Sequence, residues 1–446
     1  MSDNHAQGVR PLGPVFISYR QSDGAGYAVE MAWALRAAGV PVWHDQTDHL
    51  PGDTRRRLAE ALDSGLSGAI LLVTPEIAQS DVIRDVELPR LLEMEADPAF
   101  TLAVGSTVTK KKDPQRLSYK APDRLLGQPP GTLSRLDQQH VSTADQRARL
   151  AGRLCRRRME HVKPALAEGD GVLVFDVQTR VPPFASQPDA HLVLRLRPPA
   201  EGERRPDPRG LEDLRHFLRQ LPQLVAIAGA TQARVQGGAH LSVACAIGAA
   251  LPTTLVGAVA VVDTKGEEWR LVGQAPTARA AEEIIEFVGP PGFAFQSGRV
   301  LVYVDLLPQR SDAAVNAFLA SEGFADVAHL RSRSADLVKP ADATTVVGEI
   351  NAAIRELANK HSTTEIHLLL RCPYPIALLL GRSLNTLTVH LYEWEDGPAP
   401  DLASGVPRYV PSIVLRSGSG GSPIHAVTSP PPTETTDHRN LNGETP

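Results

Sequence analysis

The feature that most constrains the fold of this chain is a run of almost uninterrupted apolar residues, GAILLVT at 68–74, set between helical patterns. A strand of this composition is typical of a parallel sheet that is covered on both faces. The segments around it alternate, with β-rich runs at 14–19, 40–45 and 100–106 and helical patterns at 27–39, 54–65 and 81–94. This succession predicts a parallel sheet with helices on both sides.

A second regular region runs from Val172 to about Leu415 and contains two weakly similar halves. Each half offers a strand, a helix, a helix of small residues that starts just after a His-Leu pair, and a closing strand that leads to a Trp. The pairs begin at His240 and His367. We therefore expect two fused α/β modules of the open-sheet type.

Outside these two regions the sequence shows a less regular alternation of strand and helix signals. From about Val108 to Gly171 we expect a long loop and then a connecting helix at 144–162, whose basic run 156–158 is interpreted as a solvated face. The segment from Ser417 onward is rich in Gly, Ser, Pro and Thr, which predicts disorder. The predicted domains are 13–160, then 165–415 in two halves (165–285 and 286–415), and a disordered tail over 416–446.

Composition narrows the classes of function. The 446 residues, 42% hydrophobic and 22% charged, are those of a globular protein, and their number predicts two or three domains. A net charge of −5 gives no overall basic field, so duplex DNA or RNA is not an expected partner, although a local pocket for a small anion is compatible with it. No signal peptide or membrane span is indicated, and the expected location is the cytoplasm. The 3 cysteines are widely spaced, so neither disulfides nor a metal site is expected.

Three motifs in the first region resemble those of TIR domains. Residues 16–20, FISYR, lie on the first predicted strand, and VWHD at 42–45 is followed by LPGD at 50–53. The segment 80–88, SDVIRDVEL, is similar to the S-x-W-x-x-x-E-L helix of TIR domains that cleave NAD. The resemblance covers roughly residues 13–105, with the motifs in the family's order. It implies a flavodoxin-like parallel sheet.

The resemblance also implies an enzymatic site. The family's catalytic glutamate corresponds to Glu87, and the residues expected to bind substrate are Arg20, Trp43, Asp45, Leu50 and Ile83. Four of these residues also have a non-functional interpretation: Glu87 as a solvated glutamate, Trp43 as a core residue, Arg20 as part of a surface ion pair, and Asp45 as a turn or cap. Two departures from the family stand out. Ile83 replaces the aromatic residue expected four positions before the glutamate, and Pro89 predicts a kink in the helix.

The residue types suit the cleavage of NAD. Nicotinamide is bonded to ribose as a pyridinium, so it leaves as a neutral base without a proton, and an oxocarbenium-like cation remains. One carboxylate can stabilise this cation, whereas ordinary glycosidases need two carboxylates. Trp43 would stack on a flat ring, and Arg20 would approach the pyrophosphate. No G-x-G-x-x-G, Walker A or H-E-x-x-H motif is present, so NAD is expected to be a substrate and no cofactor is predicted.

The doubled region resembles SAVED domains, fusions of two CARF-like (Rossmann-like) modules that bind cyclic oligonucleotides in bacterial anti-phage systems. The resemblance rests on GGAHL at 237–241 with Ile247-Gly248, on 367–375, and on GRSLN at 381–385. Small residues at a strand-to-helix turn expose backbone N–H groups at a positive helix end, which suits phosphate. The expected ligand contacts are Gly238, His240, Arg371, Pro373, Tyr374, Arg382, Asn385 and Trp394. A structural role stays open for His240, and core packing stays open for Trp394.

Together the resemblances predict a TIR-SAVED effector of the anti-phage defence called CBASS. A cyclic oligonucleotide, with a cyclic oligoadenylate of three nucleotides favoured, would bind SAVED and drive self-association into multimers or filaments. Neighbouring TIR domains would then complete each other's sites and deplete NAD. Two alternatives remain open: a TIR scaffold without catalysis, and a hydrolase or transferase acting on another nucleotide. The sequence does not determine the ring size or bases of the activator, the linear or cyclic form of the ADP-ribose product, or the geometry of a filament.

Overall fold

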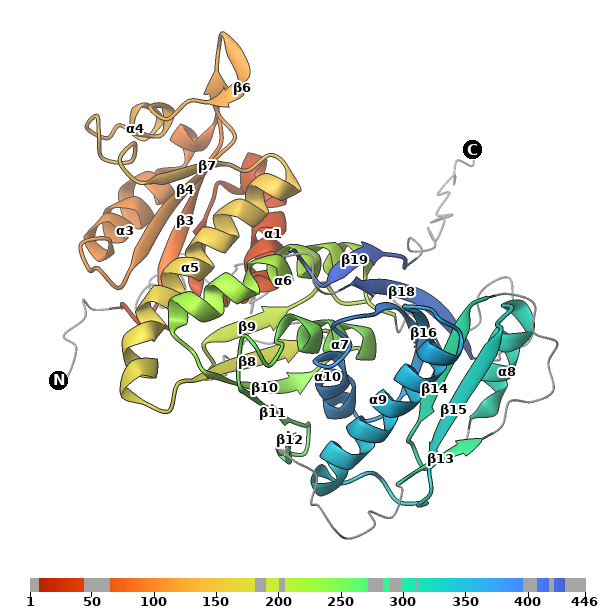
Figure 1. Cartoon of the computed structure of the whole chain (residues 1–446). Coiled ribbons are helices and arrows are strands. Elements are labelled where there is room, and N and C mark those ends of the chain that lie inside the picture. Colours follow the sequence, from red (N-terminus) through yellow and green to blue (C-terminus); the bar gives the residue numbers. More distant parts are fainter. Residues whose placement is uncertain are drawn as a thin grey trace, which may run out of the picture.

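The computed structural model describes residues 8–43, 65–180, 190–199, 205–271, 284–288, 298–309, 311–395, 407–416 and 421–429. Its N-terminal domain has the predicted parallel sheet, with strand order β2-β1-β3-β4-β7 (Figure 1). The strands are β1 Val15–Ser18, β2 Val42–Trp43, β3 Gly68–Val73, β4 Thr101–Ser106 and β7 Asp137–His140. The helix expected at 54–65 lies outside the described residues.

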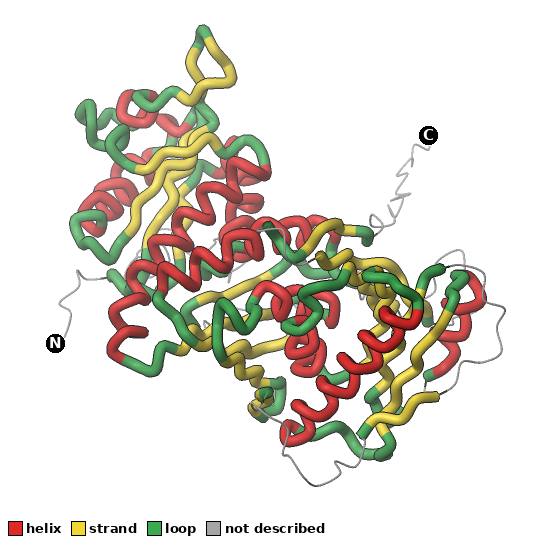
Figure 2. Tube along the Cα trace, in the orientation of Figure 1, coloured by secondary structure: helices red, strands yellow, loops and turns green. Residues whose placement is uncertain are grey.

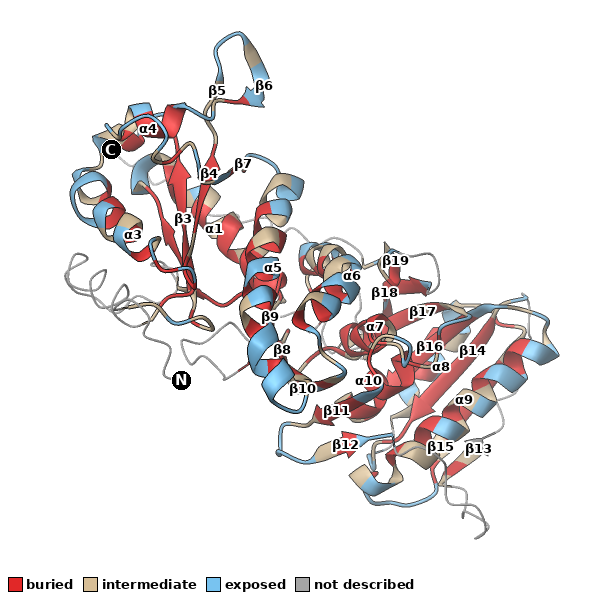
Figure 3. Cartoon of the chain, turned by 60° about the vertical axis from the view of Figure 1, so that its left-hand side comes forward, coloured by how far each residue is buried: buried red, intermediate tan, exposed pale blue. Residues whose placement is uncertain are grey.

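Helices cover both faces of this sheet. The apolar residues Val15, Ile17, Ile70 and Leu72 pack with α1 (Gln21–Ala37) and α5 (Ala144–Glu168). Phe16, Ala69 and Leu102 point to the other face, where they meet α3 (Leu88–Met94). The alternation along β1 therefore assigns each side chain to one face. Figure 3 shows the strands buried between these helices, which are exposed on their outer sides.

The region after β4 is more regular than the sequence predicted. The lysine run lies at the tip of a hairpin formed by β5 (Thr109–Lys110) and β6 (Asp113–Leu117), and a short helix, α4 (Ala121–Leu125), follows. The expectation of a long loop is therefore wrong. It also missed β7, which pairs with β4 as the fifth strand of the sheet. Its sequence DQQH lacks an apolar pattern, because this edge strand is held by pairing rather than by burial of its side chains.

The C-terminal domain begins with a five-stranded sheet in the order β12-β11-β10-β8-β9. These strands are β8 Val172–Gln178, β9 Leu192–Arg195, β10 Gln232–Gly238, β11 Ala258–Val262 and β12 Glu268–Arg270, with helices α6 Pro208–Ala228 and α7 Leu241–Ala250. All are parallel except β12. This is the first of the two predicted α/β modules.

The second module has a seven-stranded sheet in the order β13-β15-β14-β16-β17-β18-β19. Its strands are β13 Ile285–Val288, β14 Val300–Asp305, β15 Asp326–Ser332, β16 Glu365–Arg371, β17 Thr388–Glu395, β18 Arg408–Arg416 and β19 Ile424–Val427. Its helices are α8 Asp312–Ser321, α9 Ala343–Lys360 and α10 Tyr374–Gly381. Figure 2 shows α8 and α9 on opposite sides of this sheet, as their separate apolar clusters require.

Two sequence expectations in this domain need correction. A disordered tail from 416 is wrong for 421–429, because β19 pairs with β18 and Ile424 is buried there. The second helix of small residues does not start after the pair at His367, which lies within β16. It starts at Tyr374, where Pro373 and Pro375 set the backbone for a first helical turn.

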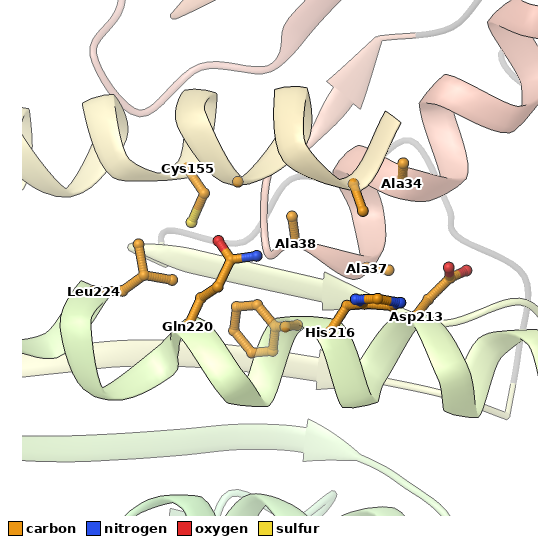
Figure 4. Close-up of a pocket in the computed structure, with 11 residues that line it drawn as sticks. Ala34, Ala37, Ala38, Cys155, Asp213, His216, Gln220 and Leu224 are labelled. Carbon is orange, nitrogen blue, oxygen red and sulfur yellow. The ribbon is translucent and has the colours of Figure 1, made fainter. Parts of the chain in front are cut away.

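The two domains share one apolar core. Helix α5 lies against α1 of the N-terminal domain and against α6 of the C-terminal domain. Figure 4 shows α1, α5 and α6 meeting around a small hollow, with Ala34, Ala37 and Ala38 on one side and Gln220 and Leu224 on another. The volume of this hollow is about 20 Å³. A hollow this small holds about one water molecule, so the junction is closely packed.

A buried arginine forms hydrogen bonds to both domains at this junction. Arg158 of α5 donates hydrogen bonds to the carbonyl oxygens of Leu12 and Gly13 at 2.9 and 3.0 Å, and to those of Ala190 and His191 at 3.2 and 2.7 Å. Only 3% of Arg158 is exposed, so the predicted solvated face is wrong for this residue, although Arg156 and Arg157 are exposed. No helix in the described part of the chain is long and apolar enough to cross a membrane.

Candidate functional site

The first candidate site lies at the carboxyl edge of the N-terminal sheet. Strands β1, β2 and β3 end at Ser18, Trp43 and Val73, and because the three strands are parallel these ends lie along one edge. Ligands of open α/β sheets bind outside this edge. The predicted substrate residues Arg20 and Trp43 come from two of these strand ends.

Glu87 is placed by an unusual turn. Residues Ile83–Glu87 form a π-helical turn that leads directly into α3. Pro89 explains the wide turn, since it has no N–H to donate and its ring would collide with the carbonyl of Asp85 in a regular α-helix. The predicted irregularity at Pro89 is thus present as a π-turn, a feature often found at functional sites. Glu87 is only 8% exposed, so this carboxylate is packed into the domain and is not a solvated surface group.

Trp43 lies on the same face of the sheet as α3. It is paired with Phe16 in the strand register, and the two ring centroids are 5.4 Å apart. The half-buried indole packs on the cluster that contains Leu91, which is four residues after Glu87. Residues four apart share one side of a helix. Trp43 and Glu87 are therefore brought to the same face of the sheet, although part of the indole serves as core.

Arg20 is held by acidic neighbours. Its guanidinium lies 2.9 Å from Glu76 and 3.2 Å from Asp23, and it donates a hydrogen bond of 2.8 Å to Gln79. These contacts join the end of β1 to the segment after β3. The structure therefore favours the ion-pair interpretation of Arg20, and contact with a pyrophosphate stays a prediction.

The remaining predicted substrate residues differ in their outcome. Ile83 is 1% exposed and packs in an apolar cluster with Leu71, Val73 and Leu133, so the structure places it in the core, away from solvent. Asp45 and Leu50 lie outside the described residues.

The second candidate site is a pocket of about 830 Å³ in the C-terminal domain. This volume is in the range of small-molecule sites. Its lining includes five of the residues predicted from sequence, namely Gly238, His240, Arg371, Tyr374 and Trp394. They come from the carboxyl ends of β10, β16 and β17 and from the starts of α7 and α10, so both modules contribute to one pocket.

Two helix N-termini lie at this pocket, since Leu241 of α7 and Tyr374 of α10 both line it, and farther along the two helices pack closely. A Cβ atom on Gly248 would lie 1.9 Å from the carbonyl oxygen of Leu378, and one on Gly381 would lie 2.1 Å from that of Cys245. Only glycine permits this approach. The positive ends of both helices lie at one cavity, as its lining by Leu241 and Tyr374 shows, and this favours a ligand with more than one phosphate.

Arg371 supplies a cation beside an aromatic ring. It donates a hydrogen bond of 2.6 Å to Asp305, and its guanidinium lies 6.0 Å from the ring centroid of Trp394. Burial raises the pKa of the Asp305 carboxyl, and Arg371 and Arg331 act in the opposite direction. Trp394 packs edge-on against Tyr409. The Arg371 side chain is thereby oriented at the pocket wall, next to a flat surface that suits a base.

One wall carries a carboxylate that sequence reasoning missed. Glu393 of β17 accepts a hydrogen bond of 2.8 Å from the backbone N–H of Ser242, in the first turn of α7. It is 5% exposed and lines the pocket. The sequence signal was its place beside Trp394 at the end of a predicted strand. Arg180, exposed at the pocket rim after β8, was missed in the same way.

His240 and Tyr374 differ in whether their polar side-chain atoms are already hydrogen-bonded within the protein. The Nδ1 atom of His240 is 2.8 Å from the hydroxyl of Thr179, which also accepts from the His240 backbone N–H at 2.9 Å. The imidazole therefore joins two loops, which is the structural role left open for it. The Tyr374 hydroxyl has no hydrogen-bond partner among the described residues, and burial raises its pKa, so it stays a neutral donor.

Three predicted ligand residues do not line the pocket. Pro373 lies between two lining residues, Cys372 and Tyr374, and forms the turn. Arg382 and Asn385 follow the far end of α10, about 12 Å from its first turn, so the expectation that they join the cluster is wrong. Arg382 is buried and donates a hydrogen bond of 2.8 Å to the carbonyl of Val256, and burial lowers its pKa. Asn385 is exposed.

Comparison with known protein families supports both resemblances. Residues 15–116 match the TIR domain family, and residues 214–415 match SAVED, the SMODS-associated and fused to various effectors sensor domain. The chain therefore has a TIR domain followed by a SAVED domain. The TIR match covers the edge with Trp43 and Glu87, and the SAVED match covers most of the pocket residues named above.

Individual relatives are more distant. The TIR domain is similar to the NAD(+) hydrolase PdTIR of Paracoccus denitrificans, with 38% identity over 65 residues. That stretch is 14% of this chain and 22% of the relative, so the chain spans about a fifth of the length of the curated protein it matches.

Two solved structures resemble the chain at low similarity. The Acinetobacter baumannii Cap4 SAVED/CARF-domain containing receptor with the cyclic trinucleotide 3'3'3'-cAAA is 13% identical, with a TM-score of 0.41, and the match covers 89% of this chain and 99% of that one. The Moraxella osloensis Cap4 receptor is 14% identical, with a TM-score of 0.34 and coverage of 87% and 98%.

Proposed function

We propose that this protein is an NAD glycohydrolase that a cyclic oligonucleotide activates. The observation that carries the catalytic half is the position of Glu87, buried on a π-turn and on the same sheet face as Trp43. The TIR family match and a relative named as an NAD(+) hydrolase support it. The sensing half is supported by the SAVED match and by the pocket where two helix N-termini meet.

The proposed reaction needs one carboxylate. The bond between ribose C1′ and the nicotinamide nitrogen breaks, and nicotinamide leaves as a neutral base with the electron pair. Glu87 stabilises the positive charge that develops on the ribose. Water then adds to C1′ with loss of one proton, which gives ADP-ribose, or a ribose hydroxyl adds, which gives a cyclic product. Trp43 offers an aromatic face to one of the flat rings of NAD.

The burial of Glu87 suggests why the enzyme would need an activator. A carboxylate that is 8% exposed is poorly accessible to a ribose ring, so substrate binding requires a rearrangement near this edge. Binding of a ligand in the SAVED pocket, followed by self-association, would supply that rearrangement. In this proposal neighbouring TIR domains complete each other's sites in a multimer or filament.

The pocket favours a cyclic oligonucleotide as the activator. Its volume, its two helix N-termini and the cations Arg180 and Arg371 suit several phosphates, and Trp394 suits a base. We propose a cyclic trinucleotide rich in adenine. A synthase that responds to phage infection would make it in the cytoplasm, and NAD depletion would follow as a defence of the CBASS type.

The test is nicotinamide release from NAD by the purified protein, with and without a panel of cyclic di- and trinucleotides. We expect release to require one cyclic nucleotide and to fall at least about a hundredfold in Glu87→Gln, as is usual when a transition-state charge partner is lost. Glu93→Gln, an exposed glutamate on the same helix, is the matched control and should keep full activity.

Two outcomes would contradict the proposal. Tight binding of a cyclic nucleotide without any nicotinamide release would indicate the non-catalytic TIR scaffold. Release that persists in Glu87→Gln would assign catalysis to another residue.

A further inference from the structure

A cluster of metal-ligating side chains lies in the SAVED domain away from the ligand pocket. Glu365 and His367 lie two residues apart on β16, so they share one face of the sheet. His390 lies on the neighbouring strand β17 and is the register partner of His367. Each residue offers one ligand atom, and these atoms lie within 4.8 Å of one another. Strand pairing thus assembles two imidazoles and a carboxylate.

One nitrogen in this cluster lacks a protein partner. His367 is 3% exposed, and its Nε2 atom has no hydrogen-bond partner among the residues that the structure describes. The other ring nitrogen, Nδ1, lies 2.7 Å from the hydroxyl of Tyr392. Buried polar atoms are nearly always satisfied in native proteins. The arrangement, one nitrogen held by a neighbour and the other left open, is typical of metal-binding histidines.

The neighbours of the two imidazoles are a carboxylate and a paired arginine. His390 Nε2 lies 2.8 Å from a carboxylate oxygen of Glu365, and the two imidazole rings are stacked with centroids 4.5 Å apart. Arg299 is paired with Glu322 at 2.9 Å, which offsets its charge.

We propose that Glu365, His367 and His390 bind one divalent transition-metal ion of the Zn²⁺ class. Two imidazoles and one carboxylate form a ligand set that such ions prefer, and because Glu365 is exposed a fourth position is open to solvent. Phe324 packs edge-on against His367 and forms an apolar surround. The bound ion would link β16 to β17.

This site is separate from the ligand pocket. His390 is four residues from Trp394 along β17, a distance of about 13 Å. The proposal is therefore independent of the proposed function. It also differs from a second cluster, formed by Asp305, Asp312 and His329. There Arg371 and Arg331 already neutralise the carboxylates, which leaves no need for a metal.

The experiment uses the full chain purified without a histidine tag. The protein is stripped with a chelator and titrated with Zn²⁺ in competition with a chromophoric chelator, and metal content is measured by elemental analysis. We expect one ion per chain and a higher melting temperature with Zn²⁺. Substitution with Co²⁺ gives a visible spectrum that reports the ligands directly.

Variants of the ligand residues are compared with control variants at other positions, so that loss of metal binding can be distinguished from loss of folding. Glu365→Gln changes an exposed residue and should weaken Zn²⁺ binding at least about tenfold, and His390→Ala should abolish the Co²⁺ spectrum. Tyr392→Phe removes the partner of His367 Nδ1 and should cost about 10–100-fold in affinity. Glu356→Gln on α9 and Asp312→Asn in the second cluster are the controls and should bind as the wild type does.

Absence of a stoichiometric ion from the wild-type protein would overturn the proposal. So would a bound ion whose affinity is the same in Glu365→Gln, His390→Ala and the wild type, since that ion would be adventitious.

Discussion

At the scale of single residues, one carboxylate in the SAVED pocket stands where a ligand phosphate is expected to bind. Glu393 accepts a hydrogen bond from the first turn of α7 and so occupies the positive end of that helix. An anion at this position is stabilised by the helix dipole and by the free N–H groups. Glu393 therefore both joins the two modules and competes with any incoming phosphate.

This competition gives a prediction that rests on the proposed function. Glu393→Gln keeps a hydrogen-bond acceptor for Ser242 but removes the negative charge. We expect the variant to bind a cyclic trinucleotide about fivefold more tightly, because a helix terminus stabilises an anion by about 1 kcal/mol. Isothermal titration calorimetry at low and high salt would measure the two affinities. The difference between the variant and the wild type should shrink as the salt concentration increases. Weaker binding in the variant would instead show that the carboxylate itself contacts the ligand.

At the scale of elements, the close contact of α7 with α10 holds together the two modules that both contribute to the pocket. Each helix contributes one glycine at the contact, and the opposing atoms are backbone carbonyls, which cannot rotate away as a side chain can. The sequence shows both helices to be rich in small or apolar residues, but it does not show that Gly248 and Gly381 face each other's helices.

The contact between α7 and α10 predicts that alanine substitution has opposite effects on stability at Gly248 and at Gly348. Gly248→Ala should destabilise the protein by about 3 kcal/mol, at the upper end of overpacking effects, and should weaken ligand binding, because the helices are forced apart. Gly348→Ala in α9 is the matched control: its Cβ would meet no atom within 4 Å. That substitution should stabilise the protein by about 0.5–1 kcal/mol through helix propensity. Urea unfolding of both variants measures the difference, and equal effects would refute the contact.

At the scale of the whole molecule, the TIR and SAVED domains are parts of one packed body. One apolar cluster continues from the TIR sheet through α1, α5 and α6 into the SAVED sheets. Glu30 of α1 also pairs with Arg197 of the SAVED domain at 2.9 Å, and desolvation of Arg197 is outweighed by its acidic partners, which raise its pKa. Under the proposed function, this shared packing is the route by which ligand binding in the SAVED domain would reach α1 and the TIR sheet that it covers.

Arg158 is the residue that tests this coupling. Arg158→Met removes four hydrogen bonds to carbonyls of both domains, and we expect a loss of about 3 kcal/mol in the free energy of unfolding. Arg157→Met, the exposed neighbour on the same helix, should change stability by less than about 0.5 kcal/mol. In calorimetry the wild type should unfold in one transition. Two separate transitions in the wild type would show that the domains fold independently.

The amino-acid sequence was enough to predict the α/β class, the order of most strands and helices, and the segments that carry chemistry. Apolar runs such as 68–74 and helical periods depend on local composition, and the ends of parallel strands meet at one edge wherever such a sheet forms. Such patterns, together with family resemblance, were enough to predict four residues of the candidate sites: Glu87, Trp43, Arg371 and Trp394.

Which distant residues meet became known from the folded structure alone. Pairing of β7 with β4, burial of Arg158, the cap of α7 by Glu393, and the grouping of Glu365, His367 and His390 join segments between 23 and 151 residues apart. No local pattern records these contacts, because they depend on strand register and on how two sheets and their helices pack. Arg382 and Asn385 are close in sequence to the pocket residue Tyr374, but α10 lies between them and Tyr374. The length of this helix puts them at its far end, away from the pocket.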